Sequence, residues 1–187
     1  MTENILRLFQ EEDAYTAGHS CRVAKIACIL GTALNLCKKD MRLLEEASEL
    51  HDLGKVRVDV TILNKPGRLT DEEFAEIKKH TSYGYAMIQP EDAVVANIIL
   101  SHHERFDGKG YPNGLAGNCI PFLSRIIAVA DSLDAMSSDR CYRKALPWSV
   151  CVSEIDKNEG KMYDPDVVHA FLSCQNEILK LFSHKQA

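Results

Sequence analysis

The stretch LLEEASELHDLGK, residues 43–55, joins a helical pattern to a polar end. Apolar residues recur at three-and-four spacing up to residue 50, which predicts an amphipathic helix that Asp40 caps and Gly54 stops. Such a helix delivers His51 and Asp52 together at its end. Imidazole and carboxylate are ligands that divalent transition metals accept. Considered alone, however, the pair is better explained as an ordinary helix end with a polar exit.

Five of the seven histidines belong to one ordered series that an aspartate closes. The series holds more ligands than one ion normally takes, which suggests two ions sharing a carboxylate. Two metals roughly 3.5–4 Å apart are a recurring device for in-line attack of a metal-bound hydroxide on a phosphate ester. In chain order, the candidate metal ligands are His19, His51, Asp52, His80, His102, His103 and Asp131.

Single members of this series have plainer explanations. His19 and His80 lie among apolar neighbours and, taken singly, are more often satisfied core histidines than ligands. Adjacent helical residues project about 100° apart, so the pair at 102–103 can share an ion only near a helix end or over a site between them. Asp131 interrupts an apolar run, where a buried carboxylate is costly unless it is paired or metal-bound. Asp134 shares that helix face and can orient the hydroxide, or hold a ligand through a hydrogen bond.

The pattern is helical nearly throughout the chain. Thr70 and Glu73 form a capping box at the start of one expected helix, and Pro90 can start the next. The glycine-rich segment 104–121 is expected to be a functional loop. No convincing strand is found, which predicts an all-α bundle with ligands gathered from four helices onto one interior site. The expected helices cover residues 16–36, 40–50, 70–87, 90–103, 123–137, 147–158 and 164–182.

Composition sets the broad class of the protein. With 187 residues and 45% hydrophobic content, the chain suits one domain, residues 1–187, with a real core. We find no signal peptide or membrane span. Seven cysteines without a CxxC pair indicate reduced thiols in a cytoplasmic protein. A net charge of −5 argues against binding to a DNA or RNA polymer, so an anionic substrate needs local positive charge.

Two motifs together resemble one known family. HDLGK at residues 51–55 and HHERFDGKGYP at residues 102–112 look like the signature of the HD-GYP family, a branch of the HD metal-dependent phosphohydrolase superfamily. The similarity runs from about residue 13 to residue 172. It includes the segments 64–70, 130–135 and 138–143. An isolated His-Asp pair is weak evidence, but this ordered set is specific.

The resemblance implies a compact HD-type helical bundle that hydrolyses cyclic di-GMP to linear pGpG and often onward to GMP. It implies a centre of divalent metals, iron or manganese first, with nickel, cobalt or zinc as alternatives. By motif position, one metal is held by His19, His51, Asp52 and Asp131, and the other by His80, His102 and His103, with Asp52 bridging. Family members are commonly fused to sensor domains, and we expect none in this chain. Protein partners that fit the resemblance are a second copy of the chain and signalling proteins such as GGDEF proteins.

Further residues take roles only through the resemblance. Lys55 matches a position that contacts a substrate phosphate, with a solvated lysine as the plainer explanation. Tyr111 of the GYP loop can face the nucleotide, or belong to a structural turn. Arg140 and Arg143 match positions that hold phosphates or guanines, although exposed arginines are usually just surface. Asp13 matches a recurrent family aspartate that supports the centre. An alternative explanation, that Asp13 caps the N-terminus of the first long helix, is nearly as good.

The sequence departs from the family pattern at three places. Members with a third metal carry a glutamate where this chain has Tyr15, so we expect two metals. Cys141 replaces a usual proline, and Arg57-Val58-Asp59 replaces a usual Gly-Ile-Pro. The last two changes lie near substrate-facing loops and leave the choice of nucleotide open.

The leading hypothesis is a phosphodiesterase in which a metal-bridging hydroxide attacks phosphorus and opens the cyclic dinucleotide. Asp52, Lys55 and Asp134 are its candidate catalytic residues. One alternative is an HD hydrolase that acts on another nucleotide or cyclic dinucleotide. The other is a regulatory module that binds a cyclic dinucleotide without hydrolysing it.

Overall fold

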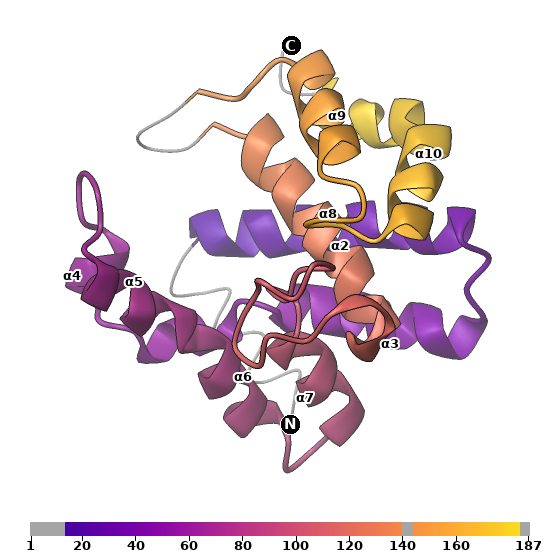
Figure 1. Ribbon diagram of the computed structural model, residues 1–187. Helices are drawn as coiled ribbons and strands as arrows, with labels where there is room; N and C mark the ends of the chain where they lie inside the picture. The colour runs from indigo at the N-terminus through magenta and orange to yellow at the C-terminus, as the bar shows by residue number, and fades with distance from the viewer. Residues whose placement is uncertain (1–13, 140–143, 184–187) are drawn as a thin grey trace.

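The computed structural model describes residues 14–139 and 144–183. Within those ranges the chain is helical and contains no strand, which confirms the predicted all-α fold (Figure 1). None of the helices in this part of the chain is long and apolar enough to cross a membrane. In order the elements are α2 (Ala14–Ala33), α3 (Lys38–Leu50), η1 (Leu53–Arg57), α4 (Val60–Leu63), α5 (Asp71–Lys78), α6 (His80–Ile88), α7 (Ala93–Leu100), η2 (Gly117–Cys119), α8 (Phe122–Ser137), α9 (Trp148–Lys157) and α10 (Pro165–Ser183).

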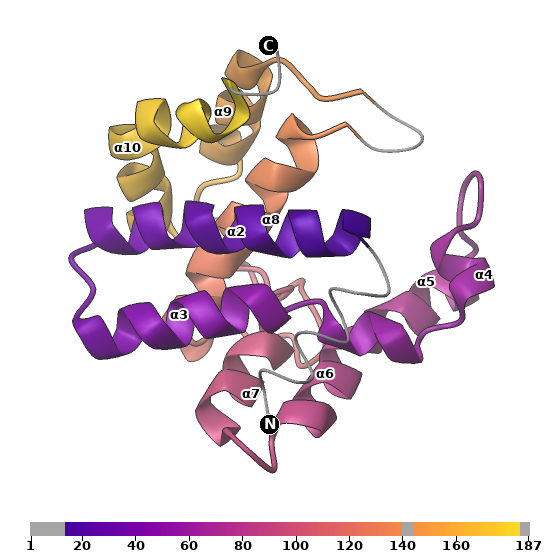
Figure 2. The ribbon, with the colours of Figure 1, turned by 180° about the vertical axis from the view of Figure 1, so that it is seen from behind.

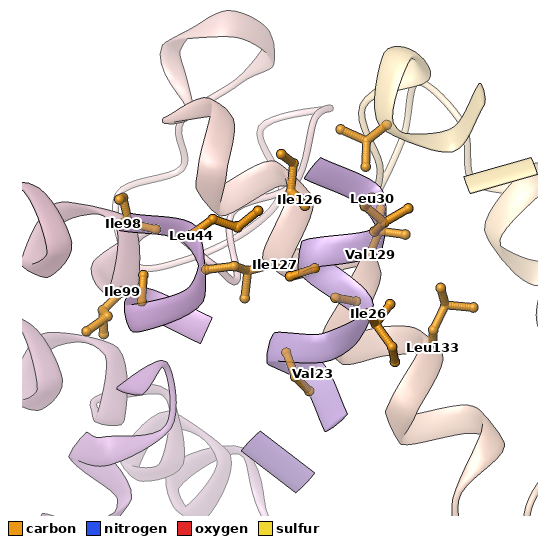
Figure 3. Close-up of a cluster of buried hydrophobic side chains, with 14 of the residues drawn as sticks. Val23, Ile26, Leu30, Leu44, Ile98, Ile99, Ile126, Ile127, Val129 and Leu133 are labelled. Atoms are coloured by element: carbon orange, nitrogen blue, oxygen red, sulfur yellow. The ribbon is translucent and has the colours of Figure 1, made fainter. Parts of the chain in front are cut away.

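Helix α2 is central to the packing. It lies antiparallel to α3, is crossed by α8 and contacts α10 (Figure 2). On its inner side Val23, Ile26 and Leu30 are fully buried. They belong to one cluster with buried residues of α3, α7 and α8 (Figure 3). Burying each such side chain contributes roughly 1.5–3 kcal/mol, so this apolar seam fixes how α2 and α8 approach each other.

Two predicted helix starts are wrong. Asp40 does not cap α3, because the helix begins at Lys38 and Asp40 lies inside its first turn. Pro90 does not start α7; the backbone N–H groups of Val94 and Val95 donate to the side chain of Asp92 instead. Both helices exist, but their starts lie two or three residues from the predicted ones. Helix α7 also ends at Leu100, three residues earlier than predicted, so His102 and His103 lie in the turn that follows it.

The predicted helix over residues 70–87 is two helices. Its capping box is confirmed: Glu73 N–H donates to Thr70 Oγ1 at 3.2 Å, and Thr70 N–H donates to the Glu73 carboxylate at 2.7 Å. Helix α5 ends at Lys78 and α6 begins at His80, with Lys79 as the cap residue between them. The break matters for the site because it sets the position of His80.

A close crossing of backbones joins the end of the HDLGK motif to α6. A Cβ atom on Gly54 would lie 1.9 Å from the carbonyl oxygen of His80 and 2.5 Å from the backbone nitrogen of Gly84. Real Cβ atoms do not approach so closely, so the crossing requires glycine at position 54. Gly54 therefore brings Asp52, which precedes η1, next to His80.

Candidate metal centre

Six candidate ligands gather into two groups inside the bundle. The ligand atoms of His19, His51 and Asp52, here called the first cluster, all lie within 4.8 Å of one another. The ligand atoms of His80, His102 and His103, the second cluster, meet the same limit. Asp52 joins the two clusters: its Oδ2 lies 3.4 Å from His51 Nε2 and its Oδ1 lies 3.5 Å from His80 Nε2. Segments far apart in the sequence thus converge on one carboxylate.

Asp131 lies beside the first cluster. Its Oδ1 is 3.2 Å from His19 Nε2, and its side chain is 19% exposed. It approaches from α8, whereas His19 approaches from α2. The structure therefore brings all seven candidate metal ligands together.

Three of the histidines are oriented by backbone carbonyl groups. A carbonyl oxygen can only accept a hydrogen bond, so the Nδ1 atom that faces it carries the proton. Each ring then presents the lone pair of Nε2 to the centre, which is the form that binds a metal. The three Nδ1 atoms and the carbonyl oxygens three residues earlier are His51 with Ser48 at 2.7 Å, His80 with Ile77 at 2.7 Å, and His102 with Ile99 at 2.6 Å.

His19 is oriented by side chains instead. Its Nδ1 lies 2.7 Å from Asp134 Oδ2. Arg22 donates to both oxygens of that carboxylate, at 2.5 and 3.0 Å, and Ser138 Oγ donates to it at 3.2 Å. Both oxygens of the buried Asp134 carboxylate are therefore engaged, by His19, Arg22 and Ser138.

The converging nitrogen atoms suit a bound cation. His51 Nε2 is buried and makes no hydrogen bond in the part of the chain that the structure describes. His80 Nε2 and His102 Nε2 lie only 3.5 Å apart. Because both Nδ1 atoms face carbonyl oxygens, two lone pairs point at one another. Buried polar atoms without partners are costly, and a divalent ion that accepts imidazole and carboxylate removes that cost. The residues present fit such an ion.

Electrostatics favours the ligand-ready protonation states at most of these positions. Burial lowers the pKa of His102, and the neighbouring His103 and His51 lower it further. Desolvation likewise lowers the pKa of His103 to about 3, against the opposing effect of Asp131. Burial alone would raise the pKa of Asp52, but Lys55 and His51 reverse this and hold it well below its usual range. The second cluster is therefore neutral, and Asp52 is ionised.

The pKa of His19 is shifted in the opposite direction, upward. Its burial disfavours the charged imidazolium, but hydrogen bonds with Asp131 and Asp134 outweigh this effect and raise its pKa to about 9. An ion bound by the first cluster must therefore displace a proton from His19 at neutral pH.

The remaining predicted residues fall into two groups. Lys55 lies at the centre, with its Nζ 2.6 Å from Asp52 Oδ2. The ring of Tyr111 packs against that of His103, with 4.8 Å between ring centres and 30° between the planes. Asp13, Arg140 and Arg143 lie outside the described residues.

Sequence reasoning missed two supporting residues. Arg22 holds Asp134, and a signal for it existed: Arg22 follows His19 by three residues, just as Asp134 follows Asp131, so each pair shares a helix face. Glu104 is buried, and its carboxylate accepts the backbone N–H groups of Asn113 at 2.7 Å and Leu115 at 3.0 Å. It thereby closes the loop that carries Tyr111.

The helical bundle and its clustered His and Asp residues define a class of protein. The HD domain family model matches residues 4–167, and the chain belongs to this family. It is of the HD-GYP type, and its relatives include proteins named as cyclic dinucleotide phosphodiesterases.

Two curated relatives and one solved structure illustrate this placement. The "Cyclic di-GMP phosphodiesterase" of Thermotoga maritima is 37% identical over 97% of this chain and 51% of its own length. The "3'3'-cGAMP-specific phosphodiesterase 3" of Vibrio cholerae is 34% identical over 91% of this chain and 37% of its own length. A solved structure described as "Bd1817, a HDG"Y"P protein from Bdellovibrio bacteriovorus" has the same fold, with a TM-score of 0.69 and 24% identity over 88% of this chain and 52% of its own. The chain spans about half the length of these proteins, or less.

Proposed function

We propose that this chain is a metal-dependent phosphodiesterase that hydrolyses cyclic di-GMP to linear pGpG. The observation that carries the proposal is the pair of ligand clusters joined through Asp52. A relative named as a cyclic di-GMP phosphodiesterase, 37% identical over nearly the whole chain, supports the choice of substrate. Onward cleavage of pGpG to GMP is the extension that the family suggests.

The ligand set suits two divalent ions, iron or manganese first. His19, His51, Asp52 and Asp131 would hold one ion, and His80, His102 and His103 the other, with Asp52 shared. Such ions lower the pKa of water and polarise phosphoryl oxygens as negative charge develops. Imidazole and carboxylate suit both metals, so the ligands alone do not choose between them.

The other residues of the centre bind and orient. Lys55 places a positive charge 2.6 Å from the shared carboxylate, where it can neutralise a phosphate oxygen of the substrate. Tyr111 forms a wall of the centre beside His103. Asp134 is a positioning residue: its oxygens engage His19 and Arg22, so it fixes the His19 ring. This role accounts for its contacts better than direct contact with the attacking group.

A second candidate substrate has its own support. A relative named as specific for 3'3'-cGAMP is 34% identical over 91% of this chain. The segment Arg57-Val58-Asp59, which departs from the family pattern, begins at the last residue of η1, the element that follows Asp52. A mixed cyclic dinucleotide is therefore the main rival to cyclic di-GMP.

The test is anaerobic incubation of the chain with Fe(II) or Mn(II) and, separately, cyclic di-GMP, 3'3'-cGAMP and cyclic di-AMP. Products are resolved by chromatography, and bound metal is measured in the same samples. We expect pGpG from cyclic di-GMP, and loss of both metal and turnover in Asp52→Ala. The control Asp156→Ala, at an exposed carboxylate on α9, should keep both. Full metal content and full activity in Asp52→Ala would exclude the bridging role.

A further inference from the structure

A lysine lies between two aromatic rings at the edge of the second cluster. Lys78, the last residue of α5, places its Nζ 4.5 Å from the centre of the Phe74 ring and 5.5 Å from the centre of the Tyr111 ring. The Tyr111 ring centre lies 4.8 Å from that of His103 and 6.5 Å from that of His80. Phe74, Lys78 and Tyr111, here called the rim triad, therefore lead from the second cluster outward.

The outer member of the triad is an exposed aromatic ring. Phe74 is 44% exposed, so part of its ring surface faces solvent. Phe74 and Lys78 are one helical turn apart, so both project from the same face of α5. An exposed aromatic face beside cationic groups is the kind of platform on which nucleic-acid bases stack.

In the part of the chain that the structure describes, the ammonium of Lys78 faces aromatic rings and not a carboxylate. Among the residues that the structure describes, no carboxylate forms an ion pair with it, and its contacts are the two rings. By contrast, the adjacent Lys79 pairs with Glu76 at 2.5 Å, and Lys65 pairs with Glu73 at 2.7 Å. Lys78 as a residue is half-buried, and its ammonium lies against aromatic rings and is available to an anion.

We propose that the rim triad is a nucleotide subsite. The Phe74 ring stacks on one purine base of the substrate, and the Lys78 ammonium pairs with a phosphate outside the metal centre. The inference rests on the proposed function, because it requires a ligand that carries both base and phosphate. A cyclic dinucleotide offers two of each, so one nucleotide can occupy the metal centre while the other reaches the rim triad.

The test compares kcat and KM for cyclic di-GMP at measured metal content. Lys78→Met keeps the aliphatic stem and removes the charge, and it should raise KM about tenfold with kcat within twofold. Phe74→Ala should raise KM by a similar factor, in line with the worth of one stacked base. Lys78→Arg and Phe74→Trp should restore KM to within about threefold.

Two controls match these changes. Lys79→Met removes the same charge one residue along, and Val94→Ala trims a side chain that is 55% exposed on α7. Both should keep KM within twofold of the wild-type value. The KM of the wild-type chain should also rise more steeply with salt than that of Lys78→Met, because the variant has lost one ionic contact. A purely structural lysine would leave that slope unchanged.

The possible results distinguish failure of the subsite proposal from failure of the proposed phosphodiesterase activity. Wild-type hydrolysis with unchanged KM in either Lys78→Met or Phe74→Ala overturns the joint subsite and leaves the phosphodiesterase assignment standing. Loss of metal in Lys78→Met makes Lys78 a support of His80 and also overturns it. If the wild-type chain hydrolyses no cyclic dinucleotide, equilibrium dialysis with cyclic di-GMP decides. Weaker binding by both variants then supports the subsite without the activity, and equal or absent binding overturns it.

Discussion

The two ligand clusters differ in how one histidine is held: His51 of the first cluster faces a backbone carbonyl like members of the second, but His19 faces a side chain. In the second cluster, the Nδ1 atoms of His80 and His102 face backbone carbonyl groups only three residues earlier in the chain. In the first cluster, the Nδ1 atom of His19 faces Asp134, which lies 115 residues further along the chain on α8. The two supports thus differ in both chemistry and range.

A side-chain support can be removed by a point mutation, whereas a backbone carbonyl support cannot. No point mutation deletes a backbone carbonyl, so the ring orientations of His80 and His102, like that of His51 in the first cluster, change only when the backbone moves. The support of His19 is a carboxylate, which one substitution changes. It also depends on the packing of α2 against α8, whose buried side chains bring Asp134 to His19. We expect the first cluster to be the more easily lost of the two.

Gly54→Ala tests the second cluster where its backbone is most constrained. The new Cβ would meet the carbonyl oxygen of His80 at 1.9 Å, so η1 and α6 must separate. We expect the free energy of unfolding to fall by about 3 kcal/mol, the upper range for overpacking. Urea denaturation measures this change, and metal analysis should find both clusters weakened, since Asp52 and His80 lie on either side of the crossing.

Gly84→Ala is the matched comparison on the other side of the crossing. Its Cβ would meet the Cγ2 atom of Ile99 at 3.1 Å, a side-chain atom that can shift. Alanine is also a better helix former than glycine by about 1 kcal/mol. The unfolding free energy should therefore stay within about 1 kcal/mol of wild type. Equal losses in the two variants would contradict the view that backbone contact at Gly54 sets the position of His80.

The fold was largely predictable from local pattern. The helix expected over 123–137 is α8, Phe122–Ser137, because its apolar spacing is regular and Pro121 precedes it. Boundaries failed where side-chain chemistry was ambiguous. Both Pro90 and Asp92 are good helix-start residues, and only the folded backbone decides between them. The break at Lys79 was missed for a similar reason, since helical spacing continues across it.

The identities of the candidate ligands were readable from the sequence, but their supports were not. An ordered series of histidines and aspartates is visible in one dimension. The contact between His19 and Asp134 depends on how α2 crosses α8, which no local pattern specifies. Glu104 is a further case: its carboxylate closes a loop through backbone groups about ten residues away, and backbone donors carry no sequence signal.

Asp134→Asn should affect the first cluster alone, because it weakens the side-chain support of His19. The amide keeps the shape of the side chain but loses the charge that faces His19 and Arg22. Changes to groups that orient a metal ligand typically cost 10–100-fold in affinity, and we expect a loss of about that size at the first cluster. Metal titration should then resolve one weakened ion and one unchanged ion per chain.

Asp156→Asn, at an exposed carboxylate on α9, is the control and should leave both affinities unchanged. If Asp134→Asn weakens both ions equally, the two clusters act as one unit, and the comparison between them fails.

His19 and His103 should show opposite pH dependences in the metal-free chain. The pKa of His19 is raised to about 9, so its contribution to stability is full below about 6.5 and is lost as pH rises toward 9. The pKa of His103 is lowered to about 3, so protons bind the unfolded chain first, and stability falls as pH drops from about 6.5 toward 3.

Urea denaturation of the metal-free chain at several pH values can separate these contributions. His19→Gln should flatten the decline in unfolding free energy on the alkaline side, because it removes the group that binds a proton in the folded state. His103→Gln should flatten the decline on the acid side. His169→Gln, at an exposed histidine on α10, should change neither side. A raised and a lowered pKa must act on opposite sides of the pH range. If His19→Gln and His103→Gln altered the same side, the inference that His19 is charged and His103 is neutral in the folded chain would be contradicted.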